Sequence, residues 1–168
     1  WLAPLVLRHV KTVCARGART REHLDSLGGV NSIDVADLAF SLDEAASFPE
    51  AVSVALGSIG KDFIVVMPSA VVRGIYESSG GDYVSAMAAL VADIRQKTGR
   101  SVVIAPHSYR AGLPEGRMND GPVCREVAGA CSGDSQVLGL DFDLTAGELR
   151  HLVAHSSVLV TSRFHAMI

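Results

Sequence analysis

The last nine residues, VTSRFHAMI, place two ionisable side chains directly after an apolar strand. Arg163 and His165 stand two positions apart where the β-branched run SSVLVTS ends. A guanidinium is a fixed cation, and an imidazole is a proton donor that titrates near neutrality. At a strand end beside a helix N-terminus, such a pair suits an anionic, phosphate-bearing substrate. The alternatives are a structural salt bridge for Arg163 and a satisfied core histidine for His165.

Two other apolar runs end in residues of similar chemistry. Pro68-Ser69 follows FIVVM, and Pro106-His107-Ser108 follows SVVIA. Ligands of open α/β sheets bind beyond the carboxyl ends of the strands. If the strands are parallel, all three groups meet at one edge, where we expect His107 and Ser108 at the rim of a pocket. A turn or structural role is the alternative for His107.

The elements that must position these residues alternate along the chain. Strands are predicted at DFIVVM, SVVIAPHS, residues 136–140 and SSVLVTS, because β-branched runs of this length suit strands buried on both faces. Helices are predicted between them: residues 82–99, with Asp82 as N-cap and Gly99 as the stop; residues 123–130; and from Thr145, where Glu148 completes a capping box. Strands separated by helices predict an α/β fold with a Rossmann-like, doubly wound parallel sheet.

The first part of the chain predicts a smaller piece of the same kind of structure. It contains a helix end at 2–10, a strand at 11–15, a helix at 18–27 closed by Gly28-Gly29, and a strand at 30–35. We interpret residues 1–45 as the C-terminal part of a first Rossmann-like domain. Residues 46–60 are predicted to be a linker containing a short helix, and residues 61–168 a second Rossmann-like domain truncated at its C-terminus. The chain opens on Trp1 without an initiator Met, so we expect it to be a fragment.

Composition excludes several classes of function. Among 168 residues, 48% are hydrophobic, which is enough for a core, and the net charge of −3 argues against a nucleic-acid partner. The three cysteines form no CxxC pair and the histidines no spacing such as HExxH, so we expect reduced, mostly buried thiols and no metal. No run of about twenty apolar residues predicts a transmembrane segment.

Four stretches also resemble the polysaccharide pyruvyl transferase family. SSVLVTSRFHAMI is similar to its signature, in which a strand ends in S-R-[hydrophobic]-H-A before a helix. ARGARTREHLDSLG resembles the family's R-x-x-x-[ST] segment at Arg16 and Thr20, and VADLAFSL its D-x-A-F segment at Asp37. The whole of GELRHLVAHSSVLVTSRFHAMI is similar to the family's helix-strand-helix. Thr20 stands where serine is more usual, and the family's N-terminal glycine-rich segment is absent.

The resemblance implies a fold and a reaction. The fold is a two-domain architecture similar to the GT-B glycosyltransferases, of which this chain is a fragment, with substrates in the cleft between the domains. The reaction moves a pyruvyl group from phosphoenolpyruvate to two hydroxyls of a sugar as a ketal, with release of phosphate. The partners are therefore phosphoenolpyruvate and a sugar or lipid-linked glycan of a cell-envelope or capsular polysaccharide precursor, and no cofactor is implied.

Transfer from this donor needs a general acid that titrates near neutrality, and we expect His165 to be that catalytic residue. The expected substrate-binding residues are Arg16, Asp37, His107, Ser108, Ser162, Arg163 and Phe164. For Asp37, the expected roles are to orient an arginine or to accept a proton from an acceptor hydroxyl, with a domain hinge as the alternative.

The first alternative function is a nucleotide-sugar-dependent GT-B glycosyltransferase. The second is a dinucleotide-dependent oxidoreductase, against which counts the absence of GxGxxG after any strand. The third is a non-catalytic glycan-binding module. We expect a cytoplasmic enzyme near the membrane where lipid-linked sugars are built. The oligomeric state stays open, with a homo-oligomer among the alternatives.

Overall fold

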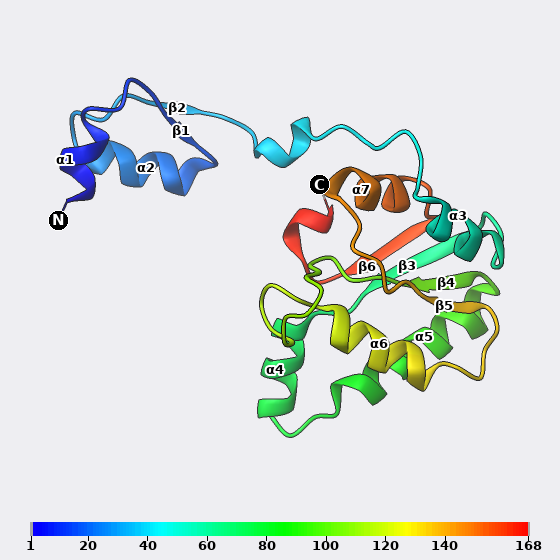
Figure 1. Ribbon diagram of the computed structural model, residues 1–168. Coiled ribbons are helices and arrows are strands. Elements are labelled where there is room, and N and C mark those ends of the chain that lie inside the picture. The colour runs from blue at the N-terminus through cyan, green and yellow to red at the C-terminus, as the bar shows by residue number, and fades with distance from the viewer. Residues whose placement is uncertain (1, 168) are drawn as a thin grey trace. The chain divides into compact units, whose positions relative to one another are not determined.

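The computed structural model describes residues 2–167, and the chain folds into two compact units, residues 1–42 and 43–168 (Figure 1). The first unit contains α1 (Ala3–Leu7), β1 (Val13–Ala15), α2 (Ala18–Ser26), β2 (Ser32–Asp34) and the short 3-10 helix η1 (Leu38–Ser41). β1 and β2 pair in parallel, with Val13 opposite Ser32. Helix α2 packs on this pair through the buried Leu24.

The second unit is a four-stranded parallel sheet with helices on both faces (Figure 1). Its elements are α3 (Glu50–Gly57), β3 (Phe63–Met67), α4 (Ala70–Ser78), α5 (Tyr83–Thr98), β4 (Ser101–Ile104), α6 (Gly121–Ala130), β5 (Val137–Gly139), α7 (Ala146–Ala154), β6 (Val158–Thr161) and the 3-10 helix η2 (Phe164–Met167). The strand order is β5-β4-β3-β6, so the chain reverses its direction of winding between β3 and β6. Numbered along this unit the order is 3-2-1-4, which matches the first four strands of the classic Rossmann order, and the predicted α/β class with a parallel sheet is confirmed.

Successive side chains of the central strands point to opposite faces of the sheet, which explains the two layers of helices. Phe63, Val65 and Met67 point to one face, where they pack with residues of α3 and α7 such as Val52 and Leu152. Ile64 and Val66 of the same strand point to the other face, where α4, α5 and α6 pack. Every residue of β3 is buried, as expected for a central parallel strand.

The predicted helix signals hold at the atomic level. Asp82 caps α5 by accepting a hydrogen bond from the Ser85 amide, and Gly99 ends the helix in the left-handed conformation with φ of 68°. Thr145 and Glu148 form the predicted capping box at α7.

Two local expectations were incomplete. Helix α4, at Ala70–Ser78, was not predicted. The cysteines are free, but Cys14 is exposed and Cys131 half-buried, so only Cys124 is the buried thiol that was expected of most of them. The short helix expected within residues 46–60 is α3, and its Val52 and Leu56 belong to the core of the second unit.

Candidate active site

The carboxyl edge of the four-stranded sheet carries the predicted functional residues of the second unit. Because β3, β4 and β6 are parallel, their carboxyl ends lie together at this edge. Ser69 follows β3, His107 and Ser108 follow β4, and Arg163 follows β6. The strand order reverses between β3 and β6, which is where open α/β sheets bind ligands.

A buried carboxylate, Asp120, joins the three loops at this edge. It lies just before α6 and is 0% exposed. One of its oxygens, Oδ1, accepts hydrogen bonds from the Ala70 amide at 2.9 Å and from Arg163 Nη2 at 2.6 Å. The other, Oδ2, accepts from Arg163 Nε at 3.2 Å and from the Ser108 amide at 3.3 Å. Asp120 therefore ties the loops after β3, β4 and β6 to one another.

Asp120 was not among the predicted site residues, although the sequence around it contains one helix-start signal. Asp directly before Gly121-Pro122 is typical of a helix start. The carboxylate does not cap its own helix, however. It receives the first amide of α4, whose N-cap residue Ser69 makes no side-chain cap bond. The first amide of α4 thus has its hydrogen-bond acceptor in Asp120, 50 residues further along the chain, and no local sequence pattern could assign this partner.

Arg163 forms the structural salt bridge that the sequence left open as one alternative. Its side chain is 19% exposed, and Nη2 also donates to the Arg117 carbonyl oxygen at 3.1 Å. A buried charge pair of this kind is held by two parallel N–H···O bonds, which fix the plane of the guanidinium. The bonds described for Arg163 use Nε and Nη2, so this geometry orients Nη1 as well.

His165 lies two residues further, in η2, and its side chain is exposed. The alternative of a core histidine is therefore wrong. Its ring contacts that of Phe164 edge to face, with the ring centroids 5.5 Å apart. Phe164 is itself 57% exposed, and Ser162 is exposed. The strand end after β6 thus presents a histidine, an aromatic ring and a hydroxyl on the surface beside a rigid arginine.

His107 is half-buried at the end of β4, and its environment favours the neutral imidazole. Burial lowers its pKa, and the positive charges of Arg163 and His165 lower it further, while Asp120 opposes them. Arg163 and His165 therefore lie close enough to His107 for their charges to affect its pKa. The structure therefore brings together three of the residues predicted at strand ends.

Arg16 and Asp37 belong to the first unit. Arg16 Nη1 donates to Asp37 Oδ2 at 2.6 Å, and Asp37 Oδ1 accepts from the Ala39 amide at 3.0 Å, as the cap of η1. Asp37 is the more buried partner, with 11% of its side chain exposed against 58% for Arg16. The carboxylate thus orients the arginine, which was one of the roles considered for it.

Beside this pair, the first unit has an open pocket with a volume of about 530 Å³. It is lined by Gly17, Ala18, Arg21, Glu22, Asp34, Val35 and Ala36, so it lies at the carboxyl ends of β1 and β2. Arg21 in this pocket is already paired with Asp25 and Asp34.

No helix within residues 2–167 has the length and apolar character needed to cross a membrane. Neither a curated protein nor a solved structure matches the chain. The sequence model of the family described as polysaccharide pyruvyl transferase matches residues 2–168. The chain therefore belongs to the polysaccharide pyruvyl transferase family.

Proposed function

We propose that the protein transfers a pyruvyl group from phosphoenolpyruvate to two hydroxyls of a sugar, forming a ketal and releasing phosphate. The observation that carries the proposal is the exposed His165 beside an arginine whose orientation is fixed by Asp120. Membership of the family supplies the reaction class. The proposed acceptor is a sugar or lipid-linked glycan of a cell-envelope or capsular polysaccharide precursor, handled in the cytoplasm.

The chemistry of the donor requires a proton at carbon. Phosphoenolpyruvate is an enol phosphate, so protonation of its methylene carbon makes a methyl group and leaves an oxocarbenium-like centre at C2. We assign this proton to His165, because an imidazole has a pKa near the working pH of a general acid. The oxygen of one sugar hydroxyl then bonds to C2 and loses its proton. Cleavage of the bond from C2 to the phosphate oxygen releases phosphate and leaves a second oxocarbenium-like centre at C2. The oxygen of the second hydroxyl bonds to this centre and loses its proton, which completes the ketal.

The phosphate and carboxylate of the donor require fixed positive charge. We assign Arg163 Nη1 to these groups, since Nε and Nη2 are held by Asp120 and Arg117. Ser162 and the main chain of Phe164, at the same strand end, are assigned to donor binding. In the first unit, Arg16 is assigned to an anionic group of the substrate, with Asp37 orienting it through their 2.6 Å ion pair.

The acceptor sugar is assigned to His107 and Ser108. Because the pKa of His107 is lowered, its imidazole is neutral near pH 7 and offers a hydrogen-bond acceptor to a sugar hydroxyl. Ser108 is half-buried at the same loop, and its amide is already held by Asp120. The loop therefore presents its polar groups from a fixed backbone.

The test measures phosphate release from phosphoenolpyruvate with galactosyl, mannosaminyl and glucosyl acceptors. We expect acceptor-dependent release that disappears in His165→Ala and persists in His23→Ala, which removes another exposed histidine. If phosphoenolpyruvate is inert and a nucleotide sugar is consumed instead, the proposal is wrong and a GT-B glycosyltransferase takes its place.

A further inference from the structure

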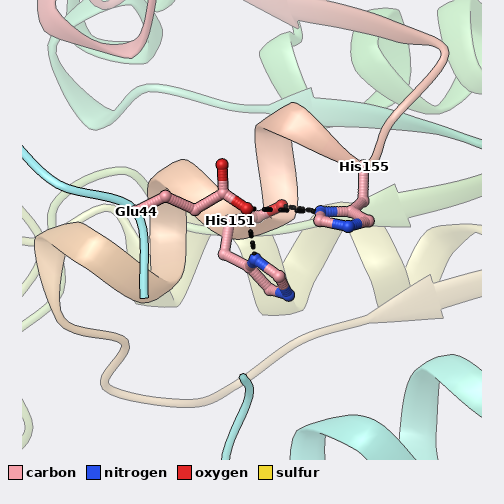
Figure 2. A group of neighbouring side chains, drawn as sticks. All are labelled: Glu44, His151 and His155. Atoms are coloured by element: carbon pink, nitrogen blue, oxygen red, sulfur yellow. Dashed lines mark hydrogen bonds and ion pairs between the residues drawn. The ribbon is translucent and has the colours of Figure 1, made fainter. Parts of the chain in front are cut away.

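Three potential metal ligands meet on the surface of the second unit, outside the candidate active site. They are Glu44, His151 and His155, and one ligand atom from each lies within 4.8 Å of the others (Figure 2). His151 Nδ1 is 2.7 Å from Glu44 Oε1, and His155 Nδ1 is 3.9 Å from the same oxygen. Figure 2 shows both imidazole rings on one side of α7 with the carboxylate facing them.

The helix supplies two of the three ligands by its period. His151 and His155 are four residues apart in HLVAH, so one turn of α7 brings both rings to one face, with centroids 4.1 Å apart. This is the spacing of the two histidines in HExxH, and the sequence analysis overlooked it. The expectation that no histidine pair has ligand spacing was therefore wrong.

The third ligand comes from a segment that is held against the helix. The Ala45 amide donates to the Gly147 carbonyl oxygen at 3.0 Å, which fixes the backbone next to Glu44 at the start of α7. The Phe48 ring packs edge-on against His151, with the centroids 4.4 Å apart. The segment that carries Glu44 is thus held against α7 by Ala45 and Phe48, and Glu44 contacts a residue 107 positions further along the chain.

We propose that Glu44, His151 and His155 form a binding site for zinc. Two imidazole nitrogens and one carboxylate oxygen are a ligand set that suits Zn²⁺, and three protein ligands leave the fourth tetrahedral position to water. The exposure of the site agrees with this, since 55% of the His155 side chain and 40% of the Glu44 side chain reach solvent, against 14% for His151.

The two contacts to Glu44 require movements of less than about 1 Å. Ligand atoms about 2.0 to 2.2 Å from a tetrahedral zinc are about 3.3 to 3.6 Å from one another. The contact between Glu44 and His151 opens slightly as the metal replaces the proton between them, and the contact between Glu44 and His155 closes slightly. His155 Nδ1 also lies 2.9 Å from the His151 carbonyl oxygen, and rotation of this exposed ring exchanges that contact for the metal.

The cluster lies away from the candidate active site. Helix α7 returns from the carboxyl end of β5 to the amino end of β6, so His151, in its last turn, and His155, its C-cap residue, lie away from the edge that carries Arg163. A metal there joins residue 44 to α7 and adds to the single backbone bond from Ala45. We therefore expect zinc to stabilise the fold without taking part in pyruvyl transfer.

The experiment is a calorimetric titration of the protein with Zn²⁺, together with thermal unfolding followed by differential scanning calorimetry. Both are done in a Cys14→Ser background, because Cys14 is an exposed thiol that would bind zinc by itself. We expect about one Zn²⁺ per chain and a higher Tm with zinc, with no such shift in Mg²⁺, which prefers oxygen ligands. His155→Ala and Glu44→Gln each remove one ligand, and we expect each to weaken the affinity at least about tenfold.

The matched control is His23→Ala, which removes an exposed histidine of α2 and should leave zinc binding unchanged. Because the side chains of His155 and Glu44 are exposed, their variants should have the Tm of the parent when no zinc is added. If the protein binds no zinc, or if His155→Ala and Glu44→Gln bind it as the parent does, the proposal is wrong.

Discussion

The substitution Asp120→Asn tests the buried network directly, because it changes the charge and one half of the hydrogen bonding without changing the shape. The carboxylate receives four hydrogen bonds, two at each oxygen. Asparagine keeps one oxygen and turns an NH₂ group toward the donors that faced the other. Two of the four bonds are therefore replaced by donor–donor contacts, and the Arg163 guanidinium loses its counter-ion.

We expect Asp120→Asn to lower the free energy of unfolding by a large amount, although it replaces only one oxygen by an NH₂ group. Removing one partner of a buried ion pair costs about 3 to 5 kcal/mol. Two lost bonds, one of them from a charged donor, account for a comparable sum at about 1 to 3 kcal/mol each. For a domain of this size we expect Tm to fall by about 4 °C for each kcal/mol, so roughly 12 to 20 °C in all.

The assays are urea denaturation, which gives the free energy of unfolding, and thermal unfolding, which gives Tm, both followed by far-UV circular dichroism with Asp93→Asn as the control. The only tryptophan is residue 1, so tryptophan fluorescence would not follow the second unit. Asp93 pairs with Lys97 on the exposed surface of α5, and its loss should cost about 0.5 kcal/mol or less. If Asp120→Asn is no more destabilising than Asp93→Asn, Asp120 does not hold the three loops together as we argue.

Three further outcomes follow from the same contacts. Arg163→Lys keeps the charge but cannot make the two parallel bonds to Asp120, so the free energy of unfolding should fall by about 1.5 to 3 kcal/mol in the same urea assay. Thr145→Ala removes the capping box of α7 and should cost about 1 kcal/mol, and an unchanged urea midpoint would count against the cap. Burial lowers the pKa of His107 below the ordinary 6.5, so the unfolded chain binds that proton more readily. Its contribution to stability is fully present above about pH 6.5 and is lost as pH falls through the lowered pKa, and His107→Gln should flatten this part of a stability–pH curve.

Sequence reasoning succeeded where the signal is local. The strand at Phe63–Met67 is a continuous β-branched run, and Asp82 and Gly99 mark the two ends of α5 by chemistry that each residue carries by itself. The parallel sheet then brings His107 and Arg163 to one edge, because every strand of the second unit runs in the same direction.

Sequence reasoning failed where the hydrogen-bond or ligand partner of a residue lies far away in the chain. Helix α4 lacks a side-chain cap of its own, and its first amide donates to Asp120, so neither the helix nor the carboxylate has a complete local pattern. The histidine pair of α7 is visible in HLVAH, but Glu44 is brought to it only by tertiary contacts. Burial of Asp120 and exposure of His165 depend on the packing of several loops, which residue spacing does not specify.

The central claim, that this protein attaches pyruvate as a ketal, is tested most directly by following carbon. Phosphoenolpyruvate labelled with ¹³C at the methylene carbon is incubated with the protein and an acceptor saccharide, and the recovered saccharide is analysed by NMR and mass spectrometry. The account predicts a labelled methyl group bound to the sugar as a ketal, formed in step with phosphate release and absent with His165→Ala. A saccharide that stays unlabelled with every acceptor, or that keeps a labelled vinyl group or phosphate, would contradict it.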